Sequence, residues 1–166
     1  EMKIFIKKIF IFTALISLMS CGYTLRGNIS LPESVNNISV YSDTFSEVAN
    51  ELNLLLTDIG IQTSNEKSLK NFSIEIIYET LNKRQLSINK DGRVNEYELI
   101  YSVSYLINSP NGNKNSDIIT LYRDYSFNEN KVLGTSERED SIKKEMVSTV
   151  SSLIMNKFRA MAVSSQ

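Results

Sequence analysis

The chain has 166 residues, and its 18 Lys and Arg against 19 Asp and Glu give a formal net charge of -1. Nucleic-acid binders usually carry a strong basic excess, so this balance argues against a nucleic-acid partner. The sequence contains no His, the commonest general base and metal ligand, and its single Cys leaves no disulfide to form within the chain.

The amino terminus has the three-part form of an export signal. Three lysines precede or flank the start of an apolar stretch over residues 9–18. This stretch is shorter than the roughly 20 residues that span a bilayer, but it suits the apolar region of a signal peptide. The segment that follows, Leu18-Met19-Ser20-Cys21, resembles the lipobox of bacterial lipoproteins. The alternative is an ordinary signal peptide followed by an unrelated cysteine.

The lipobox resemblance implies a lipid anchor at Cys21. Residues 1–20 would be removed, and Cys21 would carry a covalent diacylglycerol and an N-acyl chain, with no other cofactor. Two or more chains hold a protein stably on a bilayer, whereas one holds it only marginally. Gly22 stands where Asp would retain such a protein in the inner membrane, so we expect it on the periplasmic side of the outer membrane.

Residues 21–37 are predicted to be the lipidated cysteine and its tether, and residues 38–162 a single domain. A short strand is expected at Ile38–Tyr41. Thr44 and Glu47 fit a capping box at the start of a helix, and Gly60 suits its end. The apolar stripe of this helix has a helical period and consists of Phe45, Val48, Ala49, Leu52, Leu55, Leu56 and Ile59.

Three strands are predicted between residues 72 and 127. In the first, Phe72, Ile74, Ile76 and Tyr78 alternate with polar residues and should share one face. Asp-Gly at 91–92 predicts a hairpin turn, and Asn-Gly at 111–112 predicts a second turn. The alternating residues of the second and third strands are Tyr97, Leu99, Tyr101, Val103, Tyr105 and Ile107, and then Ile119, Leu121, Arg123, Tyr125 and Phe127.

A long helix is predicted at the carboxyl end, opened by a capping box of Ser136 and Glu139. Its apolar face consists of Ile142, Met146, Val150, Leu153, Ile154, Phe158 and Met161. The order β-α-β-β-β-α predicts an α+β fold with two helices packed on one face of a four-stranded, mostly antiparallel sheet. The opposite face would stay partly uncovered, and its Tyr and Ile side chains would favour a partner over water.

No nucleophile elbow, phosphate loop or metal-spaced cluster occurs in the sequence. The acidic pairs Glu47 with Glu51 and Glu137 with Glu139 are expected to face solvent. Without His or a free Cys, catalysis would need a Ser/Lys or carboxylate pair, and no motif marks one. The sequence therefore predicts a binding module without a metal site rather than an enzyme.

Four positive charges surround the first predicted hairpin. Lys83 and Arg84 lie near the end of one strand, and Lys90 and Arg93 flank the Asp-Gly turn. Clustered Arg and Lys donors are what phosphate recognition requires. The alternative is a charged hairpin edge that guards against aggregation.

Four segments, in the same order along the chain, resemble the lipopolysaccharide (LPS) assembly lipoprotein family, LptE. They are Cys21-Gly22-Tyr23-Thr24-Leu25-Arg26-Gly27, Asp91-Gly92-Arg93-Val94-Asn95-Glu96-Tyr97-Glu98-Leu99, Tyr122-Arg123-Asp124-Tyr125-Ser126-Phe127-Asn128, and Val132-Leu133 with Glu137 and Lys144-Glu145-Met146. The likeness covers most of residues 21–162, and the segments are more specific together than any one is alone.

The resemblance implies a one-to-one complex with LptD, a large outer-membrane β-barrel that family members plug and help to assemble. It implies two helices on a four-stranded sheet and a part in placing LPS in the outer leaflet. It also implies LPS binding through two basic positions. The first aligns with Lys90, and the second falls at the uncharged Thr135, near Lys131 and Arg138.

The leading hypothesis is therefore a plug and assembly factor for an LPS-inserting barrel, with LPS binding by Lys90, Arg93, Lys83 and Arg84. The alternative is a generic outer-membrane lipoprotein that scaffolds another envelope complex. A lipid-anchored periplasmic hydrolase is a third class. Only the first hypothesis predicts a large barrel that co-purifies at equal stoichiometry.

Overall fold

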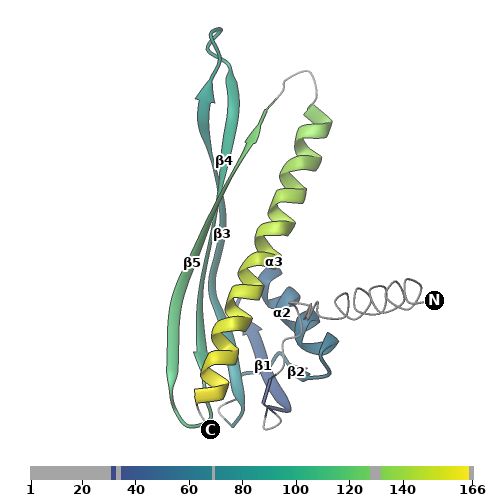
Figure 1. Ribbon diagram of the computed structural model, residues 1–166, viewed down its shortest axis with the longest axis vertical. Helices are drawn as coiled ribbons and strands as arrows, with labels where there is room; N and C mark the ends of the chain where they lie inside the picture. The colour runs from purple at the N-terminus through teal and green to yellow at the C-terminus, as the bar shows by residue number, and fades with distance from the viewer. Residues whose placement is uncertain (1–30, 33–34, 69, 128–131, 165–166) are drawn as a thin grey trace, which may run out of the picture.

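The computed structural model describes residues 31–32, 35–68, 70–127 and 132–164, with the side chains of residues 132–135 excepted. The predicted signal peptide, Cys21, most of the tether and Lys131 lie outside the described residues. The elements follow one another as β1 (Asn37–Ser42), α2 (Glu47–Asp58), β2 (Gln62–Ser64), β3 (Phe72–Ile88), β4 (Val94–Asn108), β5 (Lys114–Ser126) and α3 (Val132–Ser164) (Figure 1).

The sheet has five strands in the order β2-β1-β3-β4-β5. β1 runs parallel to both β2 and β3, and the pairs β3–β4 and β4–β5 are antiparallel. The prediction of four strands was wrong because β2 is a three-residue polar segment, Gln62–Ser64, with no apolar alternation to mark it. The α+β class and the two helices are confirmed. The sheet is mixed: the three long strands pair antiparallel, as predicted, but β1 pairs parallel with both of its neighbours.

Both helices pack on one face of the sheet and form one core with it (Figure 1). The β4 side chains on this face are buried at alternate positions, as the sequence predicted. They are Leu99, Tyr101, Val103, Tyr105 and Ile107. None of the described helices is long and apolar enough to cross a membrane.

The predicted capping box of α2 was wrong by two residues. The N-cap is Ser46, whose side chain accepts a hydrogen bond of 2.9 Å from the Ala49 N–H. Phe45 consequently precedes the helix and is 80% exposed instead of joining the apolar stripe. The predicted end is confirmed, since Gly60 follows the helix with φ +82°, the left-handed region that favours glycine.

A β-bulge in β3 overturns the predicted alternation of that strand. Ile76 pairs with Tyr105 and Tyr78 pairs with Ser104, so Ile77 is an extra residue without a partner in β4. Tyr78 therefore does not share a face with Ile76 and is 56% exposed. From Glu79 to Gln85 the strand presents its odd-numbered residues to the helices, and two further register shifts follow between Gln85 and Ile88.

α3 begins earlier than predicted, at Val132, so Ser136 lies inside the helix and is not its N-cap. Most of its predicted apolar face is confirmed as core. The buried residues are Ile142, Met146, Val150, Ile154 and Phe158. Leu153 is an exception and is 41% exposed. The helix is anchored near its carboxyl end by Phe158, whose ring meets that of Phe72 edge-on with centroids 5.4 Å apart.

We predict that Phe158→Ala lowers the free energy of unfolding by about 3–5 kcal/mol, because it removes a fully buried aromatic side chain and leaves a cavity. Leu153→Ala, at an exposed position of the same helix, should change it by about 0.5 kcal/mol or less. Urea unfolding followed by circular dichroism measures both. Equal effects of the two substitutions would contradict the assigned core face.

Candidate functional site

The β3–β4 hairpin ends in a tight turn that fixes the position of Lys90. The Gly92 N–H donates to the Asn89 carbonyl at 3.1 Å, and the Asn89 N–H donates to the Arg93 carbonyl at 2.7 Å. The Asn89 side chain accepts from the backbone N–H groups of Asp91 and Arg93, both at 3.0 Å. Gly92 has φ +76°, which the turn requires. The predicted Asp-Gly turn is thus confirmed.

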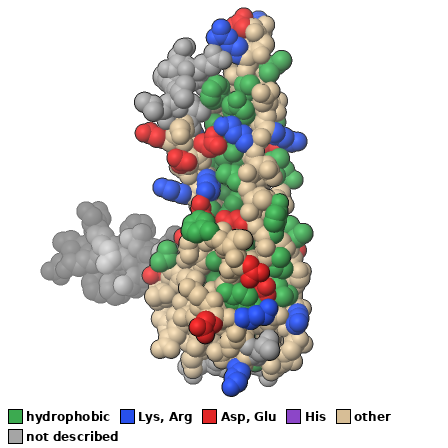
Figure 2. Space-filling view, turned by 180° about the vertical axis from the view of Figure 1, so that it is seen from behind, with side chains coloured by type: hydrophobic (Ala, Val, Ile, Leu, Met, Phe, Trp, Pro, Cys, Tyr) green, Lys and Arg blue, Asp and Glu red, His purple; other side chains and the backbone are tan. Residues whose placement is uncertain are grey.

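Lys90 and Arg93 are brought together at this tip, with Asp91 between them in the sequence, and all three are exposed. In the part of the chain that the structure describes, the Lys90 ammonium has no ion-pair partner. Figure 2 shows blue and red side chains together at the far end of the molecule, where the hairpin ends. The tip therefore carries two cations and one anion, a small positive site.

Lys83 and Arg84 do not join this tip. They are neighbours in β3, so their side chains point to opposite faces of the sheet. Lys83 lies on the helix side, where its Nζ donates to Glu139 Oε2 at 2.6 Å. Arg84 lies on the open side, where its Nε donates to Glu98 Oε2 at 2.5 Å across to β4. Lys83 therefore forms an ion pair with α3, and Arg84 forms one within the hairpin stem.

The contact of Lys83 with Glu139 forms part of a clamp between the sheet and α3. The Tyr125 hydroxyl donates to the same Glu139 oxygen at 2.5 Å. The Lys83 ammonium lies 4.4 Å from the ring centroid of Tyr97 and 5.6 Å from that of Tyr125. This clamp, Lys83 with Glu139, Tyr97 and Tyr125, ties the hairpin stem to the amino-terminal half of α3.

The clamp shifts the pKa of both its charged groups. Partial burial of Glu139 acts to raise the pKa of its carboxyl, but the hydrogen bonds from Lys83 and Tyr125 outweigh this and hold it below the ordinary value of 4.5. Burial likewise acts to lower the pKa of Lys83, and the Glu139 carboxylate outweighs it and raises that pKa. Both shifts favour the charged pair.

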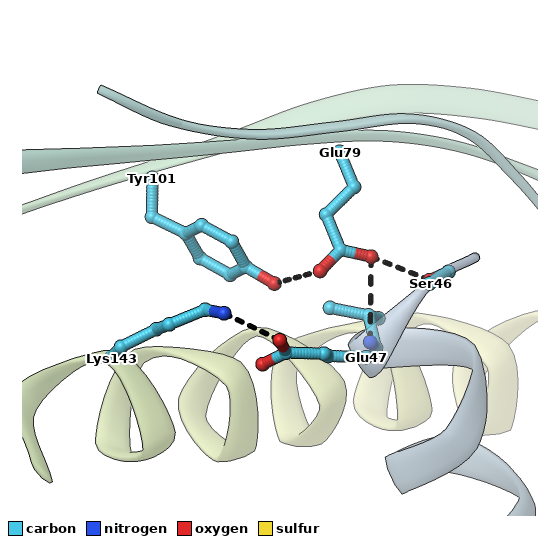
Figure 3. Close-up of polar contacts among 6 residues, drawn as sticks. Ser46, Glu47, Glu79, Tyr101 and Lys143 are labelled. Carbon is cyan, nitrogen blue, oxygen red and sulfur yellow. Dashed lines mark hydrogen bonds and ion pairs between the residues drawn. The ribbon is translucent and has the colours of Figure 1, made fainter. Parts of the chain in front are cut away.

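A second polar cluster lies between the sheet and α2 (Figure 3). The Glu79 carboxylate accepts from the Tyr101 hydroxyl and from the Ser46 hydroxyl, each at 2.5 Å. It also lies 3.5 Å from the Val48 N–H, in the first turn of α2, where the helix dipole favours an anion. Burial, and then the hydrogen bond to Glu79, raise the pKa of the Tyr101 hydroxyl well above its usual range.

Beside this cluster, the Lys143 ammonium of α3 forms an ion pair with Glu47 of α2 (Figure 3). The prediction that Glu47 and Glu139 simply face solvent was therefore wrong, because each carboxylate holds one element against another. The sequence contained one signal for the Glu79 cluster. Ile76, Ile77 and Tyr78 are three consecutive bulky residues, which a strictly alternating strand cannot place on one face.

The second basic position implied by the family resemblance falls at Thr135, an uncharged residue. Lys131 lies outside the described residues, and the Thr135 side chain is likewise not described. Arg138 is exposed on α3, next to Glu139 of the clamp. Figure 1 shows that this end of α3 lies at the same end of the molecule as the hairpin.

The sheet face opposite the helices carries several exposed apolar side chains. On β3 and β5 these are Ile77, Tyr78, Ile118 and Tyr122, each more than half exposed. Figure 2 shows hydrophobic side chains spread along the length of one side of the molecule. The described residues include no group of three or more acidic, His or Cys side chains that could hold a metal ion. The arrangement suits contact with other molecules.

A family model described as LptE, lipopolysaccharide-assembly, matches residues 33–158. The chain belongs to the LptE family. The match spans β1 to most of α3, and therefore includes the hairpin tip, the clamp and the open sheet face. No curated protein matches the sequence.

Solved structures share this fold at low sequence identity. Rare lipoprotein B from Shewanella oneidensis is 24% identical with a TM-score of 0.69, over 78% of this chain and 98% of that one. Lipoprotein B from Nitrosomonas europaea is also 24% identical with a TM-score of 0.69, over 86% and 93%. A minor lipoprotein from Acinetobacter baumannii is 19% identical with a TM-score of 0.60, over 79% and 94%. These likenesses establish the α+β architecture of the LptE-family chain.

We predict that Glu139→Gln lowers the free energy of unfolding by about 1–2 kcal/mol at neutral pH, because one ion pair and one hydrogen bond to a charge are lost. Since the pKa of Glu139 is depressed in the folded state, its stabilising effect is present above pH 4.5 and is lost as pH falls through the folded pKa. The difference from the unsubstituted protein should therefore shrink below pH 4.5.

The measurement is urea unfolding at a series of pH values. Glu137→Gln, at an exposed position two residues earlier on the same helix, is the matched control and should have little effect at any pH. A Glu139→Gln effect of the same size at pH 3 and pH 7 would contradict the clamp as the source of the stabilisation.

Proposed function

We propose that this protein plugs an outer-membrane β-barrel of the LptD type, assists assembly of that barrel and helps to insert LPS into the outer leaflet. The observation that carries the proposal is membership of the LptE family across residues 33–158. The role is one of binding and positioning, not catalysis. The open, partly apolar sheet face supports it, because such a face favours a partner over water.

The proposal includes a lipid anchor at Cys21. A diacylglycerol and an N-acyl chain on this residue would hold the mature chain on the periplasmic side of the outer membrane. The lipobox-like segment Leu18-Met19-Ser20-Cys21 and the following Gly22 support this part. The described domain begins only a short tether away, so it would act close to the membrane surface.

The hairpin tip is the proposed contact for LPS. Lys90 and Arg93 are exposed at the end of a hydrogen-bonded turn, where they would donate to phosphates of lipid A or the core. Lys83 and Arg84, the other two candidate residues, would contribute indirectly, because their ion pairs with Glu139 and Glu98 hold the hairpin stem in place. Arg138 is the candidate for a second basic contact.

We predict that Lys90→Glu weakens LPS binding by about threefold to tenfold, because an exposed ion pair is replaced by a like-charge contact. Association with the barrel should be unchanged. Lys70→Glu makes the same charge change at an exposed lysine at the other end of β3 and serves as the control. Binding of the purified lipidated protein to immobilised LPS measures both. If the two variants bind equally well, the tip is not the LPS site.

The first test of the whole proposal is a mild-detergent pull-down of the tagged, full-length protein from native outer membranes. A single large β-barrel that co-elutes at equal stoichiometry is the expected result. If the protein is lipidated and in the outer membrane but no barrel co-elutes, the proposed plug is wrong. A different co-eluting envelope complex would instead support the scaffold alternative.

A further inference from the structure

The outer surface of α2 carries amide side chains that the fold does not require. Asn50 and Asn53 lie three residues apart within this 12-residue helix and therefore share a face. Asn is a poor helix former, and neither residue caps the helix, because its N-cap is Ser46. Residues that disfavour the local structure and lie outside the core are expected where a surface has a function.

These two side chains border a hollow in the surface beside the segment that follows β2. Two adjoining depressions, of about 180 Å³ and about 500 Å³, are both lined by Asn50, Asn53 and Asn65. Asn65 follows β2, and its Oδ1 accepts a hydrogen bond of 3.3 Å from the Asn53 side chain. The larger depression falls within the range of about 300–1,000 Å³ that is usual for small-molecule sites. The three Asn residues and the hollow that they line form an amide site.

None of the described residues that line the amide site is charged, and its polar side chains are those of Asn, Ser, Thr and Tyr. Figure 2 shows a largely tan area, the colour of uncharged polar side chains and of backbone, at the broad end of the molecule where α2 lies. A phosphate or carboxylate would require a cation for strong recognition. The ligand that fits this lining is therefore neutral and polar.

The Asn53 amide retains unused hydrogen-bonding capacity. Its Nδ2 donates to Asn65, but its Oδ1 is buried and accepts no hydrogen bond from any residue that the structure describes. Such an acceptor is uncommon in a folded protein and calls for an explanation. Because Asn65 is exposed and is held to Asn53 by one bond of 3.3 Å, a small rotation of these two side chains would present the Oδ1 to a ligand hydroxyl.

Two exposed apolar side chains flank the three amides. Phe45, which lines the smaller depression, is 80% exposed, and Leu54, which lines the larger, is 61% exposed. An apolar residue just before an N-cap often packs against the fourth residue of the helix, but that residue is Asn50 here. The Phe45 ring is therefore available to pack against a ligand. The site thus combines paired donors and acceptors with apolar surface at its sides.

We propose that the amide site binds a neutral sugar unit of the LPS oligosaccharide, an inference that rests on the proposed function for the source of the sugar. A side-chain amide presents a donor beside an acceptor, which matches two adjacent hydroxyls of a sugar ring, because each hydroxyl both donates and accepts. The face of an aromatic ring carries partial negative charge, so the C–H face of the sugar would pack on Phe45. Cell-wall glycan fits less well, since its peptides carry carboxylates and the described lining holds no cation.

The place of the amide site along the molecule agrees with the order of groups in LPS. From Ile76, which pairs with Ser42 at the site, to Ile88 at the base of the hairpin turn, β3 spans roughly 40 Å. Figure 1 shows this turn and α2 toward opposite ends of the molecule. Phosphates lie on lipid A and the inner core of LPS, and neutral sugars lie farther out. A glycan freed of phosphate should therefore bind the amide site and have no use for the cationic tip.

The test is a saturation-transfer NMR titration of the purified, full-length lipidated protein in a detergent without sugar groups. The ligand is the polysaccharide released from LPS by mild acid and freed of phosphate. Asn53→Ala and Phe45→Ala should each weaken its binding by about threefold to tenfold, since each removes one direct contact. Phe45→Tyr keeps the aromatic ring and should restore binding. Asn156→Ala removes an exposed amide from α3 and is the matched control.

Weaker binding by Asn53→Ala and Phe45→Ala, with Asn156→Ala unchanged, is the expected result. Ala is a better helix former than Asn, so α2 should stay folded in Asn53→Ala, which circular dichroism checks. No binding of the polysaccharide, or equal binding by all variants, would overturn the proposal. So would stronger binding of chitotetraose, the probe for cell-wall glycan. Failure here leaves the barrel partner and the LPS contact at the tip untouched, because the pull-down and the Lys90→Glu test do not involve the amide site.

Discussion

The extra residue Ile77, in the middle of β3, is the constraint on which the described arrangement depends. A strand has a period of two, so one inserted residue moves the residues that follow to the other face of the sheet, here as far as Gln85, where the register changes again. Here it turns Tyr78 outward and Glu79 inward. Glu79 then meets the amino terminus of α2, where the Ser46 and Tyr101 hydroxyls donate to it. Without the bulge this carboxylate would face solvent, and α2 would lose its polar contact with the sheet.

The same shift determines what the hairpin can do. Because Lys83 faces the helices after the bulge, it can reach Glu139 and hold the start of α3 against the stem. The hairpin tip extends past the end of α3, as Figure 1 shows. A turn held by the Asn89 side chain then presents Lys90 away from the core. Of the four cations of the hairpin, Lys83 and Arg84 form ion pairs in the stem, and Lys90 and Arg93 lie at the tip.

The two faces and the outer edge of the sheet differ in which groups they leave exposed to water. The helix face is filled by the core, including Tyr101, Tyr105 and Phe158. The opposite face leaves apolar side chains in water, which favours contact with a larger surface. The edge at β5 leaves backbone donors and acceptors, which favour another strand. The apolar face suits the proposed barrel, whereas the backbone groups at the β5 edge can be satisfied only by water or by another strand.

Much of the fold could be predicted from the sequence because its signals are local. Apolar periodicity identified both helices and the three long strands, and Gly60, Gly92 and Gly112 marked their ends, each with a positive φ in the structure. Sequence resemblance also identified the family. What only the tertiary structure decided were the features that depend on register and on distant partners: the strand β2, the bulge at Ile77 and the separation of Lys83 and Arg84 from the tip. The physical reason is that a hairpin's sequence shows which residues are charged, whereas the face that each occupies depends on the register set by the inserted Ile77. The partner of Lys83 is decided by the distant helix α3, which brings Glu139 to it.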